Sequence, residues 1–170
     1  MYNKMASPPA PFILVTIAGL GLMPRILVGK LWNILGSREL FQQVYDTNGQ
    51  YNAKSHLAEM IALLGPPPRA LLAKSKALTE HNWPEPVTKD TGELCNNAQE
   101  FFDGPFFSAK GEFGHKEAIP SRSLEDTTSF LKEKGREAFL SFVRQMLTWL
   151  PEKRKTAREL MDHPFLKLGR

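Results

Sequence analysis

The chain has 170 residues, of which 42% are hydrophobic and 24% charged, and its formal net charge is +4. This composition excludes a collagen-like chain and wholesale disorder, and the length suits one globular domain. The single cysteine, Cys95, cannot close an internal disulfide, which excludes a disulfide-stapled secreted fold. The mild positive charge requires neither nucleic acid nor an acidic partner.

An apolar segment lies near the N-terminus. Residues 12–23 carry no charge, and a second apolar run resumes after Pro24 and Arg25. Because a transmembrane helix needs about 20 apolar residues, the first run is too short to span a bilayer. We therefore expect a buried segment of a globular fold. The alternative is a small membrane-anchored protein that uses residues 12–28, which cell fractionation would distinguish.

Two helices are predicted in the next part of the chain, separated by a polar loop at residues 42–55. The first ends at Gly36 and carries apolar residues at helical spacing: Leu27, Leu31, Ile34 and Leu35. The second ends at Gly65, before three prolines, and its apolar residues share one face: Leu57, Met60, Ile61 and Leu64. A further short helix with Leu71 and Leu72 can begin at Pro67 or Pro68.

Residues 80–128 show no sustained periodicity, because prolines and glycines interrupt every run. Five phenylalanines nevertheless fall within 13 residues: Phe101, Phe102, Phe106, Phe107 and Phe113. This density is too high for a solvated linker, so we predict an ordered loop pinned to a neighbouring surface. An aromatic platform for nucleic-acid bases is disfavoured, because these rings are not interleaved with lysine and arginine as such a platform requires.

The last third of the sequence is the most regular. Six apolar residues predict a long helix that Pro151 ends: Phe139, Phe142, Val143, Met146, Leu147 and Leu150. Thr156 and Glu159 form the pattern of a capping box, which starts a short helix ending near His163 and Pro164. The expected fold is mainly α, with about five helices and one long ordered loop.

Four blocks of the sequence resemble a known family. Residues 139–166 (FLSFVRQMLTWLPEKRKTARELMDHPFL) resemble the end of the C-terminal lobe of eukaryotic protein kinases. The motif residues there are Pro151, Arg154, Thr156, His163 and Pro164. Residues 56–68 (HLAEMIALLGPPP) are similar to the helix and turn before the insert of the group that contains MAP kinases, and residues 31–41 (LWNILGSRELF) to the central helix of that lobe. Residues 119–125 are similar to fungal SR-protein kinases.

This resemblance implies a domain organisation and a function. Residues 31–167 correspond to a partial kinase C-lobe with an insert at about 69–130, whereas residues 1–30 do not match the family. The family phosphorylates Ser/Arg-rich proteins with ATP and Mg²⁺, in the cytoplasm or the nucleus. It docks these basic substrates through acidic residues on the helix before the insert. Here that possible docking helix keeps His56 and Glu59, while Ser55 and Ala62 hold the other two acidic positions.

The sequence lacks the motifs that kinases use for phosphoryl transfer. It contains no glycine-rich loop, no β3 lysine, no His-Arg-Asp and no Asp-Phe-Gly. Glu112-Phe113-Gly114 is the nearest approach, but it lies after the insert helix instead of before it. We therefore assign no catalytic, cofactor-binding or metal residue, and expect a kinase fragment that neither binds ATP nor transfers phosphate. The alternative is a noncatalytic helical interaction module.

Arg154 carries a separate expectation. In kinases the arginine at this turn forms a buried ion pair with the glutamate of an Ala-Pro-Glu motif, which this sequence lacks. Arg154 is therefore expected to be exposed, or to pair with Glu152 or Asp162, because an unpaired buried charge is costly. The surrounding basic cluster is interpreted as a solvated face and not as a nucleic-acid site. We interpret His56 and His163 as helix-end residues and not as metal ligands.

Overall fold

The computed structural model describes residues 23–167, with side chains from residue 29 onward. Residues 1–22, which carry most of the apolar N-terminal segment, lie outside the described residues, as does most of the segment proposed as a membrane anchor. None of the helices between residues 23 and 167 is long and apolar enough to span a bilayer.

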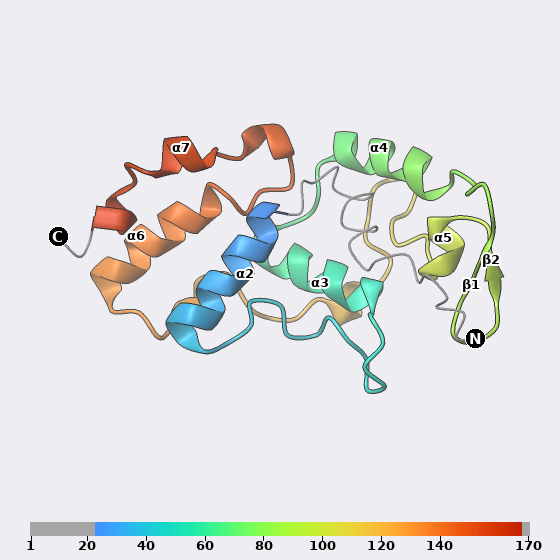
Figure 1. Ribbon diagram of the computed structural model, residues 1–170, viewed down its shortest axis with the longest axis horizontal. Helices are drawn as coiled ribbons and strands as arrows, with labels where there is room; N and C mark the ends of the chain where they lie inside the picture. The colour runs from blue at the N-terminus through green and yellow to red at the C-terminus, as the bar shows by residue number, and fades with distance from the viewer. Residues whose placement is uncertain (1–22, 168–170) are drawn as a thin grey trace, which may run out of the picture.

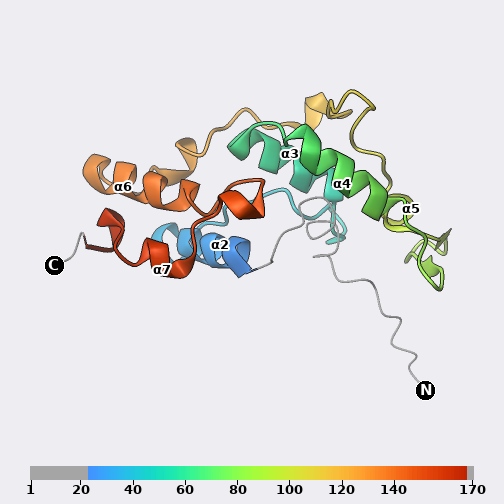
Figure 2. The ribbon, with the colours of Figure 1, turned by 90° about the horizontal axis from the view of Figure 1, so that it is seen from above.

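The described chain is mainly helical, as predicted, and elongated (Figure 1). In chain order its elements are α2 (Met23–Gly36), α3 (Ala53–Leu64), α4 (Arg69–Thr79), β1 (Val87–Thr88), β2 (Leu94–Cys95), α5 (Ala98–Phe101), α6 (Glu133–Arg144) and α7 (Ala157–Leu160). Short 3-10 turns lie at Lys116–Ala118, Asp126–Thr128, Pro151–Lys153 and Pro164–Lys167. In both views α6 and α7 lie at one end, α5 and the β1–β2 hairpin lie at the other, and α2 and α3 lie between them (Figure 2).

The main hydrophobic core joins α2 to α6. Phe139 of α6 is fully buried and its ring lies 4.8 Å from that of Trp32 and 5.1 Å from that of Phe165. The indole N–H of Trp32 donates to the carbonyl oxygen of Thr127 at 3.1 Å and to its hydroxyl at 3.0 Å. These contacts hold together segments about 95 residues apart in the chain.

The predicted apolar face of α2 is wrong in part. Ile34 is 75% exposed and Leu35 is also exposed, whereas among the side chains described in this helix, from residue 29 to 36, the buried one is Trp32, at 1%. Leu27 lies outside the residues whose side chains are described. Trp32 was not part of the predicted face. Trp32 is buried because its ring packs on Phe139 of α6 and its indole N–H bonds to Thr127. The spacing of leucine and isoleucine along the helix gives no information on these distant partners.

The length predicted for α6 is also wrong. The helix ends at Arg144, and the chain then continues in turns up to Pro151, although Met146 and Leu147 are buried as expected. Leaving the helix lets Trp149 reach a second part of the molecule, where its indole N–H donates to the carbonyl of Gly65 at 2.9 Å. There Trp149 packs in a small core with Met60 of α3 and Leu71 of α4.

The end predicted for α3 at Gly65 is confirmed, whereas its start at Ala53 lies inside the loop predicted at residues 42–55. Asn52 caps its N-terminus, because its side chain accepts a hydrogen bond from the backbone N–H of Ser55 at 3.0 Å. Gly65 follows its C-terminus with a φ of +74°, a conformation that favours glycine, and its N–H donates to the carbonyl of Ile61 at 2.8 Å. After the prolines, α4 begins with Pro68 as its N-terminal neighbour.

The long ordered loop predicted at residues 80–128 is confirmed and contains short elements. β1 and β2 pair antiparallel, with Val87 opposite Cys95 and Thr88 opposite Leu94. Phe106 and Phe113 are buried against Leu57 of α3, and the other three phenylalanines are partly buried. The loop is therefore held by burial of its rings on α3, as its composition predicted.

Candidate functional site

The centre of the predicted docking helix is a buried ion pair. Glu59 of α3 is only 1% exposed. One carboxylate oxygen accepts from the Arg122 guanidinium at 3.2 Å, and the other accepts from the backbone N–H of Gln42 at 2.7 Å. Arg122 also donates to the carbonyl of Leu40 at 2.6 Å. Glu59 therefore joins α3 to the segment after α2 and to the segment before the Asp126–Thr128 turn.

His56 lies one turn before Glu59 and is also buried. Its Nδ1 lies 3.0 Å from the hydroxyl of Tyr51, and its ring meets the edge of Phe41 at a centroid distance of 4.9 Å. These contacts are structural. Between residues 23 and 167 no group of three or more histidine, cysteine, aspartate or glutamate side chains is placed to hold a metal ion.

The position of these two residues bears on docking. Glu59 is the only acidic residue of α3, so this helix presents no exposed carboxylate to a basic peptide. The role of His56 and Glu59 in docking stays a prediction. A basic partner bound at α3 would have to displace the contacts that Glu59 makes with Arg122 and Gln42.

Arg154 follows the 3-10 turn that begins at Pro151, and it is partly buried. Its guanidinium donates twice to the carbonyl oxygen of Thr148, at 3.2 Å and 3.0 Å, and among the described residues it forms no ion pair. Burial lowers the pKa of Arg154, while the more distant charge of Glu152 raises it. The expected exposed side chain or direct ion pair is thus replaced by a backbone carbonyl, which satisfies the cation without a carboxylate.

The residues around the last helix act as local caps. Thr156 and Glu159 form the predicted capping box of α7. The backbone N–H of Phe165 donates to Nδ1 of His163 at 3.2 Å, which stabilises the turn that Pro164 begins. The His163 ring also packs on Phe142 of α6, at a centroid distance of 5.3 Å.

The capping box makes stability depend on pH in acid. The pKa of Glu159 falls from 4.5 to about 2, first because the backbone N–H of Thr156 donates to its carboxylate and then because the Lys155 ammonium does. Since the folded pKa is the lower one, the ionised carboxylate stabilises the fold above pH 4.5, and this contribution is lost as the pH falls towards 2. We expect Glu159→Gln to lower the urea midpoint above pH 4.5 and to match the unchanged chain near pH 2.

Thr156→Ala serves as the companion variant, because it removes one hydroxyl donor of the same carboxylate. It should reduce the acid dependence of the urea midpoint without abolishing it. If the difference in urea midpoint between Glu159→Gln and the unchanged chain stayed constant from pH 4.5 down to pH 2, the lowered pKa of Glu159 would be contradicted.

The structure also describes Glu112-Phe113-Gly114, the nearest approach of this sequence to an Asp-Phe-Gly motif. Phe113 is buried in the core on α3, and its ring lies 5.4 Å from that of Phe107. The Glu112 carboxylate points to the surface, where Lys116 lies 3.7 Å away. That this chain binds no ATP and transfers no phosphate stays a prediction.

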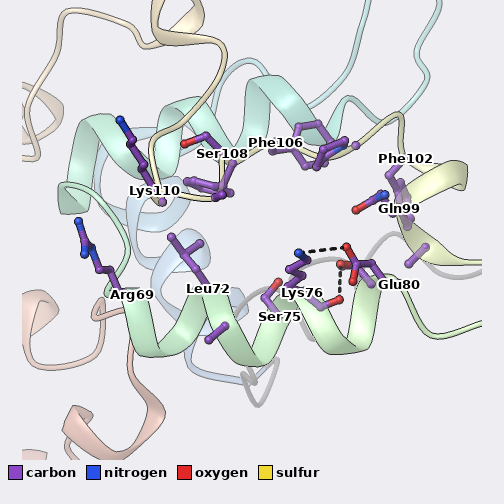
Figure 3. A pocket seen from close by; sticks show the side chains of 18 residues that line it. Arg69, Leu72, Ser75, Lys76, Glu80, Gln99, Phe102, Phe106, Ser108 and Lys110 are labelled. Carbon is purple, nitrogen blue, oxygen red and sulfur yellow. Dashed lines mark hydrogen bonds and ion pairs between the residues drawn. The ribbon is translucent and has the colours of Figure 1, made fainter.

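A cleft of about 570 Å³ separates α4 from the segment that runs through α5 to Gly111 (Figure 3). Leu72 lines it from α4, Phe106 and Phe102 line it from the opposite segment, and most of its lining is apolar. The sequence analysis missed this cleft. Its two sides come from residues 69–80 and 98–111, which are too far apart in the chain for a local pattern to connect them.

No protein-family model matches this sequence. The chain is, however, 31% identical over 140 residues to two proteins named serine/threonine protein kinase, from two strains of Aspergillus fumigatus. The matched segment covers 82% of this chain, and the chain spans 29% of the length of these curated relatives. Over most of its own length, the chain is therefore related in sequence to fungal serine/threonine protein kinases.

Proposed function

We propose that residues 31–167 form part of the C-terminal lobe of a serine/threonine kinase of the SR-protein kinase type, with the insert at about 69–130. The observation that carries this proposal is the order of the four blocks, at residues 31–41, 56–68, 119–125 and 139–166. They fall in family order within a chain that is 31% identical to fungal kinases over 82% of its length. The mainly helical fold supports the same assignment.

The surface of α2 supports a larger fold around this chain. Ile34 is largely exposed and Leu35 is exposed beside it, on the helix that resembles the central helix of the kinase lobe. In kinases that helix is buried all round. We therefore propose that further kinase structure covers α2.

The proposed role of this segment is structural support and not chemistry. In intact kinases of this type, Mg²⁺ and ATP supply the phosphoryl group, and Ser/Arg-rich proteins receive it. This sequence holds none of the residues that bind the nucleotide or accept the substrate proton. We therefore propose that the 170-residue chain alone neither binds ATP nor transfers phosphate, and that its setting is cytoplasmic or nuclear.

A phosphate-transfer assay tests the inactivity of the chain. The purified 170-residue chain is incubated with radiolabelled ATP, Mg²⁺ and an Arg-Ser repeat peptide, beside an intact SR-protein kinase as the positive control. We expect no label on the peptide above the blank without protein. Transfer that is lost on heating, and that stays with the chain through two different purification steps, would contradict the proposal.

A further inference from the structure

We propose that the cleft between α4 and the 98–111 segment binds a small organic anion with an apolar body, of which a medium-chain carboxylate is the simplest example. This proposal does not depend on the kinase assignment. A volume of about 570 Å³ lies within the range of ligand pockets, and a mostly apolar lining with a few polar groups is typical of them. The side chains of Leu72, Phe102 and Phe106 supply the apolar surface (Figure 3).

The charges of the cleft are placed at one end. Arg69, the first residue of α4, and Lys110 of the opposite segment both line that end (Figure 3). Neither side chain forms an ion pair or a hydrogen bond with another residue between 23 and 167. The third cation of the lining, Lys76, lies 3.7 Å from Glu80, so a negative charge accompanies it within the same lining. The uncompensated positive charge is therefore confined to the end with Arg69 and Lys110.

A tight turn holds Lys110 in this position. The N–H of Gly111 donates to the carbonyl of Ser108 at 2.8 Å, and Gly111 has a φ of +79°. A Cβ atom added at Gly111 would lie 3.2 Å from Cδ1 of Leu72 and 3.8 Å from Cγ of Arg69. The backbone of the turn thus approaches α4 closely beside Arg69, which places the exposed side chains of Lys110 and Arg69 at the same end of the cleft.

The ligand class follows from this arrangement. An apolar chain or ring would replace water against the phenylalanines, and a carboxylate would interact with both cations, to which arginine can donate two parallel hydrogen bonds. A cationic amphiphile of the same length would meet Arg69 and Lys110 with like charge. The cleft should therefore distinguish ligands by the sign of their head group.

Isothermal titration of the 170-residue chain with three probes that share an eight-carbon chain tests the proposal. We expect saturable one-to-one binding of octanoate, weaker binding of octan-1-ol, and the weakest binding of octyltrimethylammonium. Added salt should weaken the binding of octanoate more than that of the alcohol. Absence of saturable octanoate binding, or equal affinity for the cationic probe, would overturn the proposal.

Two sets of variants locate the binding. The double variant Arg69→Gln/Lys110→Gln should bind octanoate roughly fivefold to thirtyfold more weakly, with little change for octan-1-ol, because only the exposed charges are removed. The double variant Lys132→Gln/Lys134→Gln carries the same net charge and changes exposed lysines at the start of α6, so it should bind octanoate as the unchanged chain does. Equal weakening by both double variants would overturn the site.

Ala73→Phe gives an independent check, because Ala73 lines the cleft from α4 and a larger side chain there would fill it. Octanoate and octan-1-ol should both lose affinity in this variant. Circular dichroism of every variant, compared with the unchanged chain, shows that each one retains its helices. A folded Ala73→Phe that still binds octanoate with unchanged affinity would place the binding elsewhere and overturn the proposal.

Discussion

Phe139→Ala is expected to destabilise the fold by about 3–5 kcal/mol. Phe139 is fully buried, and its ring packs on those of Trp32, Phe165 and Phe130, the last at a centroid distance of 6.4 Å. Truncation removes the apolar contact and leaves a cavity among rings that cannot collapse fully. A loss of this size is a large fraction of the total stability of a typical domain, about 5–15 kcal/mol.

Urea unfolding followed by circular dichroism measures the effect as a lower midpoint at an unchanged slope. Met161→Ala is the matched control, because Met161 is 71% exposed and its truncation should change stability by no more than about 0.5 kcal/mol. If Phe139→Ala lost less than about 1 kcal/mol, the packing of α6 against α2 would be wrong.

Arg122→Met is expected to cost about 3–5 kcal/mol for a different reason. The change keeps the apolar volume of the side chain but leaves the buried Glu59 carboxylate without its cation, and the carbonyl of Leu40 without its donor. The cost is set by the charge that remains and not by the contact that is lost. The same urea titration reports it.

Arg144→Met is the matched control for this prediction. Arg144 pairs with Glu125, but both side chains are about half exposed, so breaking that pair should cost less than about 1 kcal/mol. In the double variant Arg122→Met/Glu59→Gln the charge is removed together with its partner, and part of the lost stability should return. Equal losses in Arg122→Met and Arg144→Met would show that the Glu59 pair is not buried as described.

The inward position of Glu59 changes what the family resemblance implies for docking. A sequence comparison places an acid on the helix before the insert, which is where SR-protein kinases bind basic substrates. The structure directs that carboxylate to Arg122 and to the backbone of Gln42 instead. Binding of Ser/Arg-rich proteins by this chain therefore remains a prediction, and the anionic preference proposed for the neighbouring cleft is opposite in sign.

The sequence alone predicted those features that depend on neighbouring residues. The capping box of α7 was predicted because Thr156 and Glu159 are three residues apart and each bonds to the backbone N–H of the other. The end of α3 at Gly65 was predicted because glycine and the following prolines stop a helix locally. The burial of the phenylalanine-rich loop was predicted because five phenylalanines within 13 residues are too many for a segment exposed to solvent.

Only the tertiary structure decided which residues meet across long separations. In the structure Trp32 is buried while Ile34 is exposed, and α6 ends at Arg144. Glu59 pairs with Arg122, and the turn after Lys110 approaches Arg69. Each of these outcomes depends on contacts with a distant segment, whereas helical periodicity shows only which residues share a face of one helix. The spacing of residues along the sequence therefore predicted a mainly helical chain with an ordered phenylalanine-rich loop, while the packing of distant segments determined which of its charges are buried and which are exposed.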